Sequence, residues 1–168
     1  MKENLLYVFV EGADDERFFR WYFRKRKIKI IKYAQEKRVK TNQFIQTIQE
    51  MEHADYIFMT DKDNFKLNEK LERIQSWYPS IDLDRVYVAI QEVEGWYLAG
   101  VTRDTCKEWG IRYYYDTNDL VKEDFNALIP RPFLSRIDFM LEILKNFSMP
   151  EALRRNRSFR YFVSNNRR

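Results

Sequence analysis

The chain has 168 residues, about the size of one domain, and its 45% hydrophobic and 33% charged residues argue against both disorder and a membrane protein. It contains only 4 glycines and no G-x-x-x-x-G-K-[ST] or G-x-G-x-x-G string, which excludes a nucleotide-driven motor in this chain. A single cysteine, Cys106, and a single histidine, His53, cannot form an internal disulfide, a thiolate zinc site or a histidine-rich metal site. Any metal ion must therefore be held by oxygen atoms.

The net charge of +4 is modest, but the charges are strongly segregated along the chain. Residues 16–40 carry eleven Lys or Arg and two acids, whereas residues 50–94 carry eleven acids and five bases. The last eighteen residues carry six Arg and one acid. Two basic segments around an acidic middle fit a polyanionic substrate that meets a cation-loaded centre. Ordinary surface charge is the alternative interpretation.

The first predicted element is a strand over residues 5–10, an almost wholly apolar run that is typical of a parallel sheet buried on both faces. This run is too short for a signal-peptide core or a membrane-spanning helix, so we expect a cytoplasmic protein. A helix over residues 13–27 should follow, with Asp14 and Asp15 at its start.

Strands and helices continue to alternate up to residue 90. We expect further strands at residues 28–33, 54–59 and 85–90, a helix capped by Thr41, and a helix from Leu67 to Trp77. This alternation predicts an α/β fold with a central parallel sheet of about four strands, flanked by helices on right-handed crossovers.

Residues 1–100 should form this Rossmann-like domain, because the alternation ends near Gly100. Residues 101–168 should form a helical extension packed on the same domain. Its helices are expected near residues 103–109, 119–129, 134–147 and 151–163.

Acidic residues follow three of the four predicted strands. In a parallel sheet the loops after the carboxyl ends of the strands meet at one edge, where ligands bind. These loops carry five candidate metal ligands: Glu11, Asp61, Asp63, Glu92 and Glu94. So many carboxylates at one edge repel one another unless cations are bound there. The sequence therefore predicts a cation site at this edge.

Asp61 and Asp63 are separated by one residue. On an extended segment both side chains point to the same side and can share one cation. A polar turn that caps the next helix is the alternative interpretation of this common pattern. A calcium loop of the EF-hand type is excluded, because Lys66 stands at the sixth position, where that loop needs glycine.

The other acids differ in how well a structural role explains them. Glu11 directly follows a buried strand, where an acid has no packing role, and Gly12 lets the backbone turn tightly beneath a ligand. Asp15 suits a helix cap as well as a metal ion. Glu92 and Glu94 suit the first turn of the short helix that should follow them.

Two segments of the chain resemble the signature motifs of the Toprim domain. V-F-V-E-G-A-D-D at residues 8–15 is similar to its hydrophobic strand and Glu-Gly motif, and F-M-T-D-K-D at residues 58–63 is similar to its D-x-D motif. Q-E-V-E-G-W-Y-L-A at residues 91–99 and R-S-F-R-Y-F at residues 157–162 resemble OLD-family and small standalone Toprim proteins.

The resemblance implies a Toprim-like fold and specific roles for these acids. Glu11 would be the catalytic glutamate, and Asp61 and Asp63 would bind one or two Mg²⁺ or Mn²⁺ ions. The further acidic positions would be Asp15 and Glu92 or Glu94.

OLD-like nucleases also use a C-terminal lysine near the scissile phosphate. The matching stretch at residues 132–136 offers Arg136 instead, which becomes the candidate catalytic cation. The ATPase that accompanies the OLD Toprim domain is missing from this chain, so it would be a separate partner subunit or absent.

Together these observations predict a Mg²⁺- or Mn²⁺-dependent nuclease that hydrolyses phosphodiester bonds of DNA or RNA, in phage defence or nucleic-acid processing. Five arginines are expected to contact the phosphate backbone without reading the base sequence: Arg20, Arg24, Arg154, Arg155 and Arg157. The alternative is a non-catalytic nucleic-acid-binding or effector subunit whose acidic edge binds a metal for folding or regulation. Arg136 in place of lysine slightly favours this alternative.

Overall fold

The computed structural model describes residues 4–166 and divides the chain into two compact units. The first unit ends at Val88 and the second begins at Ala89, which is earlier than the boundary expected near residue 100. The reason is that helix α4 (Glu94–Ala99) packs against later helices of the chain rather than belonging to the first unit. No helix within residues 4–166 is long and apolar enough to cross a membrane.

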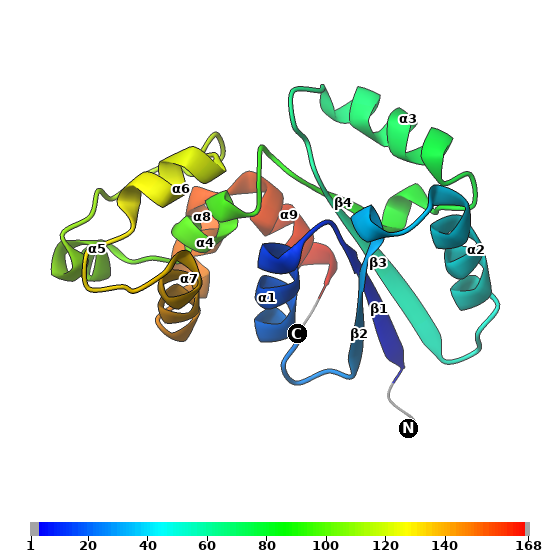
Figure 1. Cartoon of the computed structure of the whole chain (residues 1–168), viewed down its shortest axis with the longest axis horizontal. Helices are drawn as coiled ribbons and strands as arrows, with labels where there is room; N and C mark the ends of the chain where they lie inside the picture. Colours follow the sequence, from blue (N-terminus) through cyan, green and yellow to red (C-terminus); the bar gives the residue numbers. More distant parts are fainter. Residues whose placement is uncertain (1–3, 167–168) are drawn as a thin grey trace. The chain divides into compact units, whose positions relative to one another are not determined.

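The first unit is built on a parallel sheet of four strands, which confirms the expected α/β architecture. The strands are β1 (Leu5–Val10), β2 (Ile28–Lys32), β3 (Ala54–Asp61) and β4 (Val86–Ala89). Their order, β2-β1-β3-β4, places β1 and β3 side by side in the centre of the sheet (Figure 1). Val8 is aligned with Ile30 of β2 and with Ile57 of β3. The carboxyl ends of β1 and β3 therefore lie at the same edge.

Helices cover both faces of this sheet. Helix α1 (Ala13–Tyr22) lies on one face, and α2 (Arg38–Gln49) and α3 (Leu67–Trp77) lie on the other (Figure 1). Short 3-10 turns at Tyr33–Gln35 (η1) and Leu83–Arg85 (η2) complete the unit. Helix α1 ends at Tyr22, five residues before the expected end at residue 27, because the four cations of residues 24–27 would repel one another on a helix.

Helix α2 begins at Arg38, so the expectation that Thr41 caps this helix is wrong. The backbone N–H of Thr41 already donates to the carbonyl of Lys37 at 3.0 Å, which places Thr41 inside the first turn. Its side chain is buried, and its hydroxyl has no hydrogen-bond partner within residues 4–166. A cap at Thr41 would have satisfied that hydroxyl.

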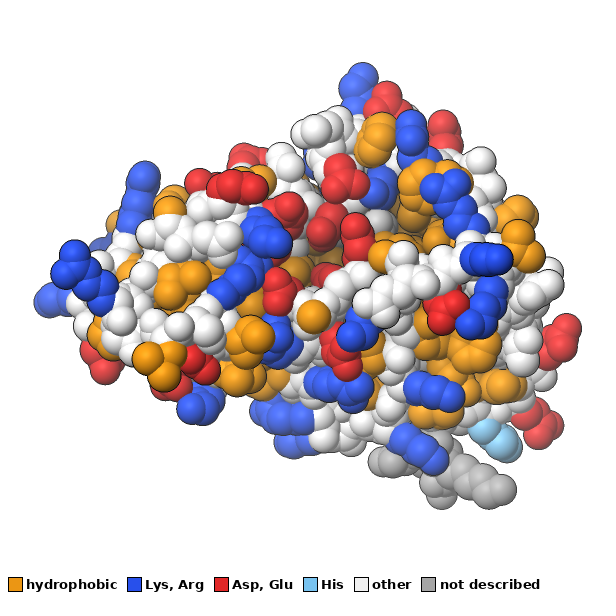
Figure 2. Space-filling view, in the orientation of Figure 1, with side chains coloured by type: hydrophobic (Ala, Val, Ile, Leu, Met, Phe, Trp, Pro, Cys, Tyr) orange, Lys and Arg blue, Asp and Glu red, His pale blue; other side chains and the backbone are white. Residues whose placement is uncertain are grey.

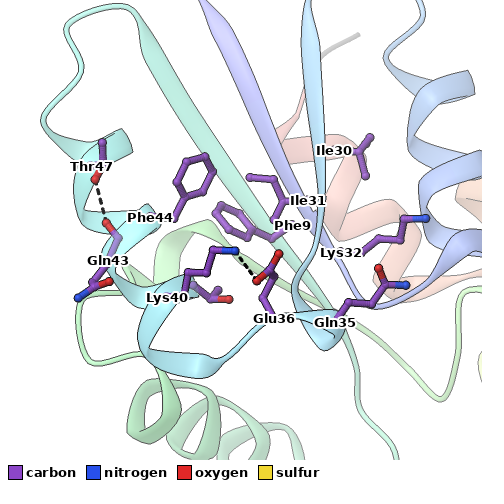
Figure 3. A pocket seen from close by; sticks show the side chains of 11 residues that line it. Phe9, Ile30, Ile31, Lys32, Gln35, Glu36, Lys40, Gln43, Phe44 and Thr47 are labelled. Atoms are coloured by element: carbon purple, nitrogen blue, oxygen red, sulfur yellow. Dashed lines mark hydrogen bonds and ion pairs between the residues drawn. The ribbon is translucent and has the colours of Figure 1, made fainter.

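Between β2 and α2 the first unit contains a cavity of about 530 Å³ (Figure 3). Phe9, Ile31 and Phe44 supply apolar lining, and Thr41 is also part of the lining. On its polar side Lys40 is ion-paired with Glu36, with 2.7 Å between Nζ and Oε2. The cavity therefore has apolar walls, and the Lys40–Glu36 ion pair on its polar side carries no net charge.

The second unit is helical, as the sequence predicts for this half. Its helices are α4, α5 (Arg103–Trp109), α6 (Lys122–Leu128), α7 (Arg136–Lys145), α8 (Met149–Arg155) and α9 (Arg157–Asn165). Trp96 of α4 is fully buried, and its indole N–H donates to the Ser158 hydroxyl at 2.8 Å. Aromatic side chains of α9, Phe159 and Phe162, each lie 5.3 Å from the Trp96 ring, so Trp96 is the centre of this core.

The single helix expected over residues 151–163 is two helices. Asn156 lies between them in an extended conformation, with φ −136° and ψ 118°. Its side-chain oxygen accepts a hydrogen bond from the backbone N–H of Phe159 at 3.0 Å and so caps α9. The extended conformation of Asn156 therefore changes the direction of the chain. Residues before it no longer lie on the helix face that a single helix over residues 151–163 would give them.

The tight packing of α4 gives a first testable prediction. A Cβ atom added at Gly95 would lie 2.6 Å from the backbone oxygen of Thr117, whereas one at Gly12 would lie 3.8 Å from its nearest neighbour. Gly95→Ala should therefore lower the free energy of unfolding by about 2 kcal/mol, and Gly12→Ala should change it by less than about 1 kcal/mol. Urea unfolding followed by circular dichroism measures both changes. Equal effects of the two substitutions would show that α4 has room to shift.

Candidate functional site

Three of the predicted carboxylates act on one tyrosine hydroxyl at the carboxyl edge of the sheet. The hydroxyl of Tyr33 lies 3.5 Å from Oε2 of Glu11, to which it can donate a hydrogen bond. Burial raises the pKa of Tyr33 well above its ordinary value, and the negative charges of Glu11, Asp15 and Asp61 raise it further. A hydrogen bond with the Thr60 side chain opposes this rise. Tyr33 therefore stays protonated, surrounded by acids from three segments of the chain.

Aromatic packing fixes the Tyr33 hydroxyl in this position. The ring is buried, stacks on Phe58 of β3 at 4.3 Å between ring centres, and meets Tyr78 edge-on at 6.2 Å. Phe58 in turn stacks on Phe9 of β1. The sequence indicated Tyr33 only as the end of a strand, but a tyrosine directly after β2 also lies at the edge where the acids were expected.

Glu11 and Asp61 occupy equivalent places on the two central strands. Glu11 directly follows β1, and Asp61 is the last residue of β3. Glu11 is exposed to solvent, whereas Asp61 is half-buried and its Oδ1 atom is fully buried. Because β1 and β3 pair in parallel, the structure brings these two acids to the same edge, as the sequence predicted.

Asp15 has a clear structural role beside its place near Tyr33. Its Oδ2 atom accepts a hydrogen bond from the backbone N–H of Gly12 at 2.9 Å, and this contact fixes the turn into α1. The side chain is buried. Gly12 has φ −141°, which any residue adopts, so the expected tight turn does not require its glycine conformation.

Asp63 does not share the arrangement expected for it. Strand β3 ends at Asp61, and Asp63 adopts a left-handed conformation with φ 54°, so the alternation of an extended segment does not apply. Its Oδ2 atom lies 2.6 Å from Nζ of Lys70, whose side chain is buried in α3. The sequence analysis did not identify Lys70. The signal was available, because Lys70 lies in the first turn of the helix that follows Asp61 and Asp63, where a lysine can pair with a nearby acid. The ammonium group of Lys70 neutralises Asp63.

The second unit holds the remaining acids and the candidate catalytic arginine. Arg136, the first residue of α7, donates to Oε1 of Glu94, and its guanidinium carbon lies 4.9 Å from the centre of the Phe125 ring. Glu94 is buried, and burial raises its pKa although Arg136 opposes the rise. Glu92 accepts a hydrogen bond from the backbone N–H of Lys122. Within their own unit, Arg136 and both acids thus have structural partners.

The described part of the chain contains no group of three or more His, Cys, Asp or Glu side chains at distances suited to a shared metal ion. The donor set around Tyr33 nevertheless consists only of oxygen atoms, which suits Mg²⁺ or Mn²⁺. Glu11 and Asp61 are the acids best placed to bind such an ion, because Asp15 already caps α1.

The predicted nucleic-acid contacts fall into two classes. Arg155 is buried, with 2% of its surface exposed, and it donates to the backbone carbonyls of Tyr114, Ala99 and Val101 at 2.6, 3.1 and 2.5 Å. The expectation that Arg155 contacts phosphates is therefore wrong, because the break at Asn156 turns it into the core. The exposed members of the set are Arg20, Arg24, Arg154 and Arg157. Arg167 and Arg168 lie outside the described residues.

Two of the exposed arginines are engaged by acids of their own helices. Arg20 binds Glu16 with 2.8 Å between nitrogen and oxygen, and Arg154 binds Glu151 at the same distance. Exposed pairs of this kind are weak, so a phosphate group can compete for either arginine.

Replacing the buried arginine should separate its structural role from nucleic-acid binding. Arg155→Gln leaves buried carbonyls without a charged donor and should lower the free energy of unfolding by at least about 3 kcal/mol. Arg157→Gln, which loses the same charge at an exposed position, should change it by less than about 0.5 kcal/mol. Urea unfolding of the two variants and wild type measures both changes in the free energy of unfolding. A stable Arg155→Gln variant would contradict the burial seen here.

The raised pKa of Glu94 predicts a pH-dependent stability difference. Because the pKa in the folded protein is above the ordinary value of 4.5, protonated Glu94 adds stability that is fully present below that value and is lost as the pH rises through the folded pKa. Glu94→Gln imitates the neutral form, so its melting temperature relative to wild type should rise between about pH 4 and about pH 7. The exposed Glu108→Gln variant is the control and should show no such change. A relative loss of stability of Glu94→Gln toward pH 7 would mean that the ion pair with Arg136 outweighs burial.

Comparisons of this chain with protein-family models, with curated proteins and with solved structures gave no match. In the first unit, the parallel sheet and the positions of Glu11 and Asp61 at its carboxyl edge agree with the placing of the sequence motifs.

Proposed function

We propose that this protein is a Mg²⁺- or Mn²⁺-dependent phosphodiesterase of the Toprim type that hydrolyses DNA or RNA. The observation that carries the proposal is the position of Glu11 and Asp61 at the carboxyl ends of two paired parallel strands, with the Tyr33 hydroxyl 3.5 Å from Glu11. Like charges close together at one edge cost free energy, and a bound cation would offset that cost. Ligand sites of parallel sheets are found at this edge.

Glu11 and Asp61 would hold the cation, and Asp15 would support it from the start of α1. A bound Mg²⁺ or Mn²⁺ would polarise the scissile phosphate and stabilise the leaving oxygen. Glu11 is exposed and can also transfer a proton as a general acid or base.

Two residues of the first unit would position these acids. The Tyr33 hydroxyl stays protonated because burial raises its pKa, so it can donate to Glu11 and orient that carboxylate. Lys70 neutralises Asp63 and fixes the loop that follows Asp61.

The second candidate function is a non-catalytic nucleic-acid-binding or effector subunit. Two observations favour it: the described residues contain no ready three-acid metal group, and the candidate catalytic Arg136 is engaged by Glu94. Such a subunit would bind a cation and nucleic acid but would cleave neither DNA nor RNA.

Cleavage assays with purified protein distinguish the two functions. Wild type should nick supercoiled plasmid or cut labelled RNA with Mg²⁺ or Mn²⁺ and stop when EDTA removes the metal. Glu11→Gln should reduce the rate at least about a hundredfold, because it removes a group that acts on the reaction. Glu52→Gln, with the same charge change at an exposed site beyond the other edge of the sheet, should cleave like wild type.

Equal rates for wild type and Glu11→Gln would contradict the catalytic role of Glu11. If wild type cleaves nothing, but Mn²⁺ raises its melting temperature and not that of Asp61→Asn, the non-catalytic subunit is the better description.

A further inference from the structure

Two arginines of the first unit are held by aromatic rings instead of acids. The guanidinium carbon of Arg38 lies 4.0 Å from the centre of the Trp77 ring. That of Arg73 lies 4.2 Å from the centre of the Phe65 ring and 5.8 Å from that of Trp77. Phe65, Arg73, Trp77 and Arg38 thus form a continuous alternating series, which we call the stacked row. It joins the start of α2 to one side of α3.

Ion pairing separates these arginines from other cations of the same unit. Neither Arg38 nor Arg73 has a carboxylate within ion-pair distance in the described part of the chain, although both are exposed. Other cations of the unit do pair with acids: Arg17 with Asp14, Arg20 and Lys32 with Glu16, Lys40 with Glu36, Lys70 with Asp63, and Arg85 with Asp55. Stacking fixes the plane of a guanidinium group and leaves its N–H groups available for a planar or tetrahedral anion.

Helix stability does not explain the position of Arg38. It is the first residue of α2, the preceding residue is Lys37, and the first turn contains no acid. Positive charge at this end of a helix is unfavourable, because the helix dipole is positive there. The start of α2 therefore combines the positive end of the helix dipole with two basic side chains and has no acid in its first turn.

The stacked row lies beside the acidic group around Tyr33. Phe65 follows Asp63 by two residues, and Tyr78 directly follows Trp77. The ring of Tyr78 meets the ring of Tyr33 edge-on at 6.2 Å, and the Tyr33 hydroxyl lies 3.5 Å from Oε2 of Glu11. The end of α3 that carries Trp77 is therefore joined to the acidic group by two packed tyrosines of the same unit.

Part of the stacked row lines a surface groove. The groove has a volume of about 570 Å³ and is lined by Phe65, Arg73 and Trp77 together with Glu69, Glu72 and Ser76 of α3. Over α2 and α3, cationic side chains lie next to apolar ones on the face shown in Figure 2, so bases and phosphates of one strand can both find contacts there.

We propose that Arg38 and Arg73 form a phosphate-binding site that holds a nucleic-acid strand beside the acidic group. The aromatic rings of Phe65 and Trp77 hold the guanidinium groups in place. The site rests on the proposed function for its role in cleavage, but binding at Arg38 and Arg73 requires neither a metal ion nor hydrolysis.

Binding of fluorescein-labelled dT20 in EDTA, followed by anisotropy at several salt concentrations, tests the site directly. Replacing both Arg38 and Arg73 with Gln should weaken binding at least about tenfold and lower the slope of log affinity against log salt by about 1.4, as expected for two lost phosphate contacts on a single strand. The control replaces Lys29 and Arg85 with Gln, which loses the same charge at the amino edge of the sheet. The control should weaken binding less than about threefold at an unchanged slope.

A second pair of substitutions separates stacking from charge. Arg38→Lys with Arg73→Lys keeps the charge but loses the planar group, so its affinity should fall between those of wild type and the Gln variant. Circular dichroism confirms that each variant is folded, and the Lys variant keeps the test valid if the Gln variant unfolds.

Three results would overturn the site: no binding of dT20 by wild type, equal weakening by the control, or an unchanged salt slope in the Arg38 and Arg73 variant. If dT20 binding depends on both arginines but wild type cleaves nothing with Mg²⁺ or Mn²⁺, the phosphate site stands and the proposed hydrolysis fails. If wild type cleaves and the double variant binds and cleaves equally well, only the phosphate site fails.

Discussion

The parallel pairing of β1 with β3 is the constraint on which the candidate site depends. It places Glu11 and Asp61 at one edge, and Tyr33, stacked on Phe58, brings its hydroxyl to 3.5 Å from Glu11. The backbone ladder and the aromatic core together supply the free energy that holds like charges close to one another. A chain whose strands were paired in another order would distribute these acids along the edge.

Several charges at this edge are balanced by the protein itself. Lys70 neutralises Asp63, and the backbone N–H of Gly12 binds Asp15. Glu11 directly follows β1, and Asp61 is the last residue of β3, so these two acids lie at the carboxyl ends of the central strands. The described residues contain no ready three-acid metal group, although the sequence motifs contain several carboxylates.

Aromatic residues have two distinct uses in the first unit. Phe9, Phe58 and Tyr33 stack in the core and position a hydroxyl. Phe65 and Trp77 are partly exposed and orient arginines at the surface. In the second unit, by contrast, the guanidinium group of Arg155 donates to backbone carbonyls and stabilises the fold. The number of arginines in a segment thus says little about how many can bind phosphate.

The sequence by itself determined the parallel sheet, the approximate helices and the placing of Glu11 and Asp61 at its carboxyl edge. Apolar periodicity is a local property of the chain, and the loops after parallel strands meet at one edge whatever the order of the strands. Only the tertiary structure decided the conformation of Asp63, the break at Asn156 and the inward turn of Arg155. The inward turn of Arg155 in particular depends on partners distant in the chain, such as the carbonyl of Ala99. Neither periodicity nor residue type predicts such a contact. Arg154 and Arg155 are neighbours in the same helix, yet one is exposed and the other is buried.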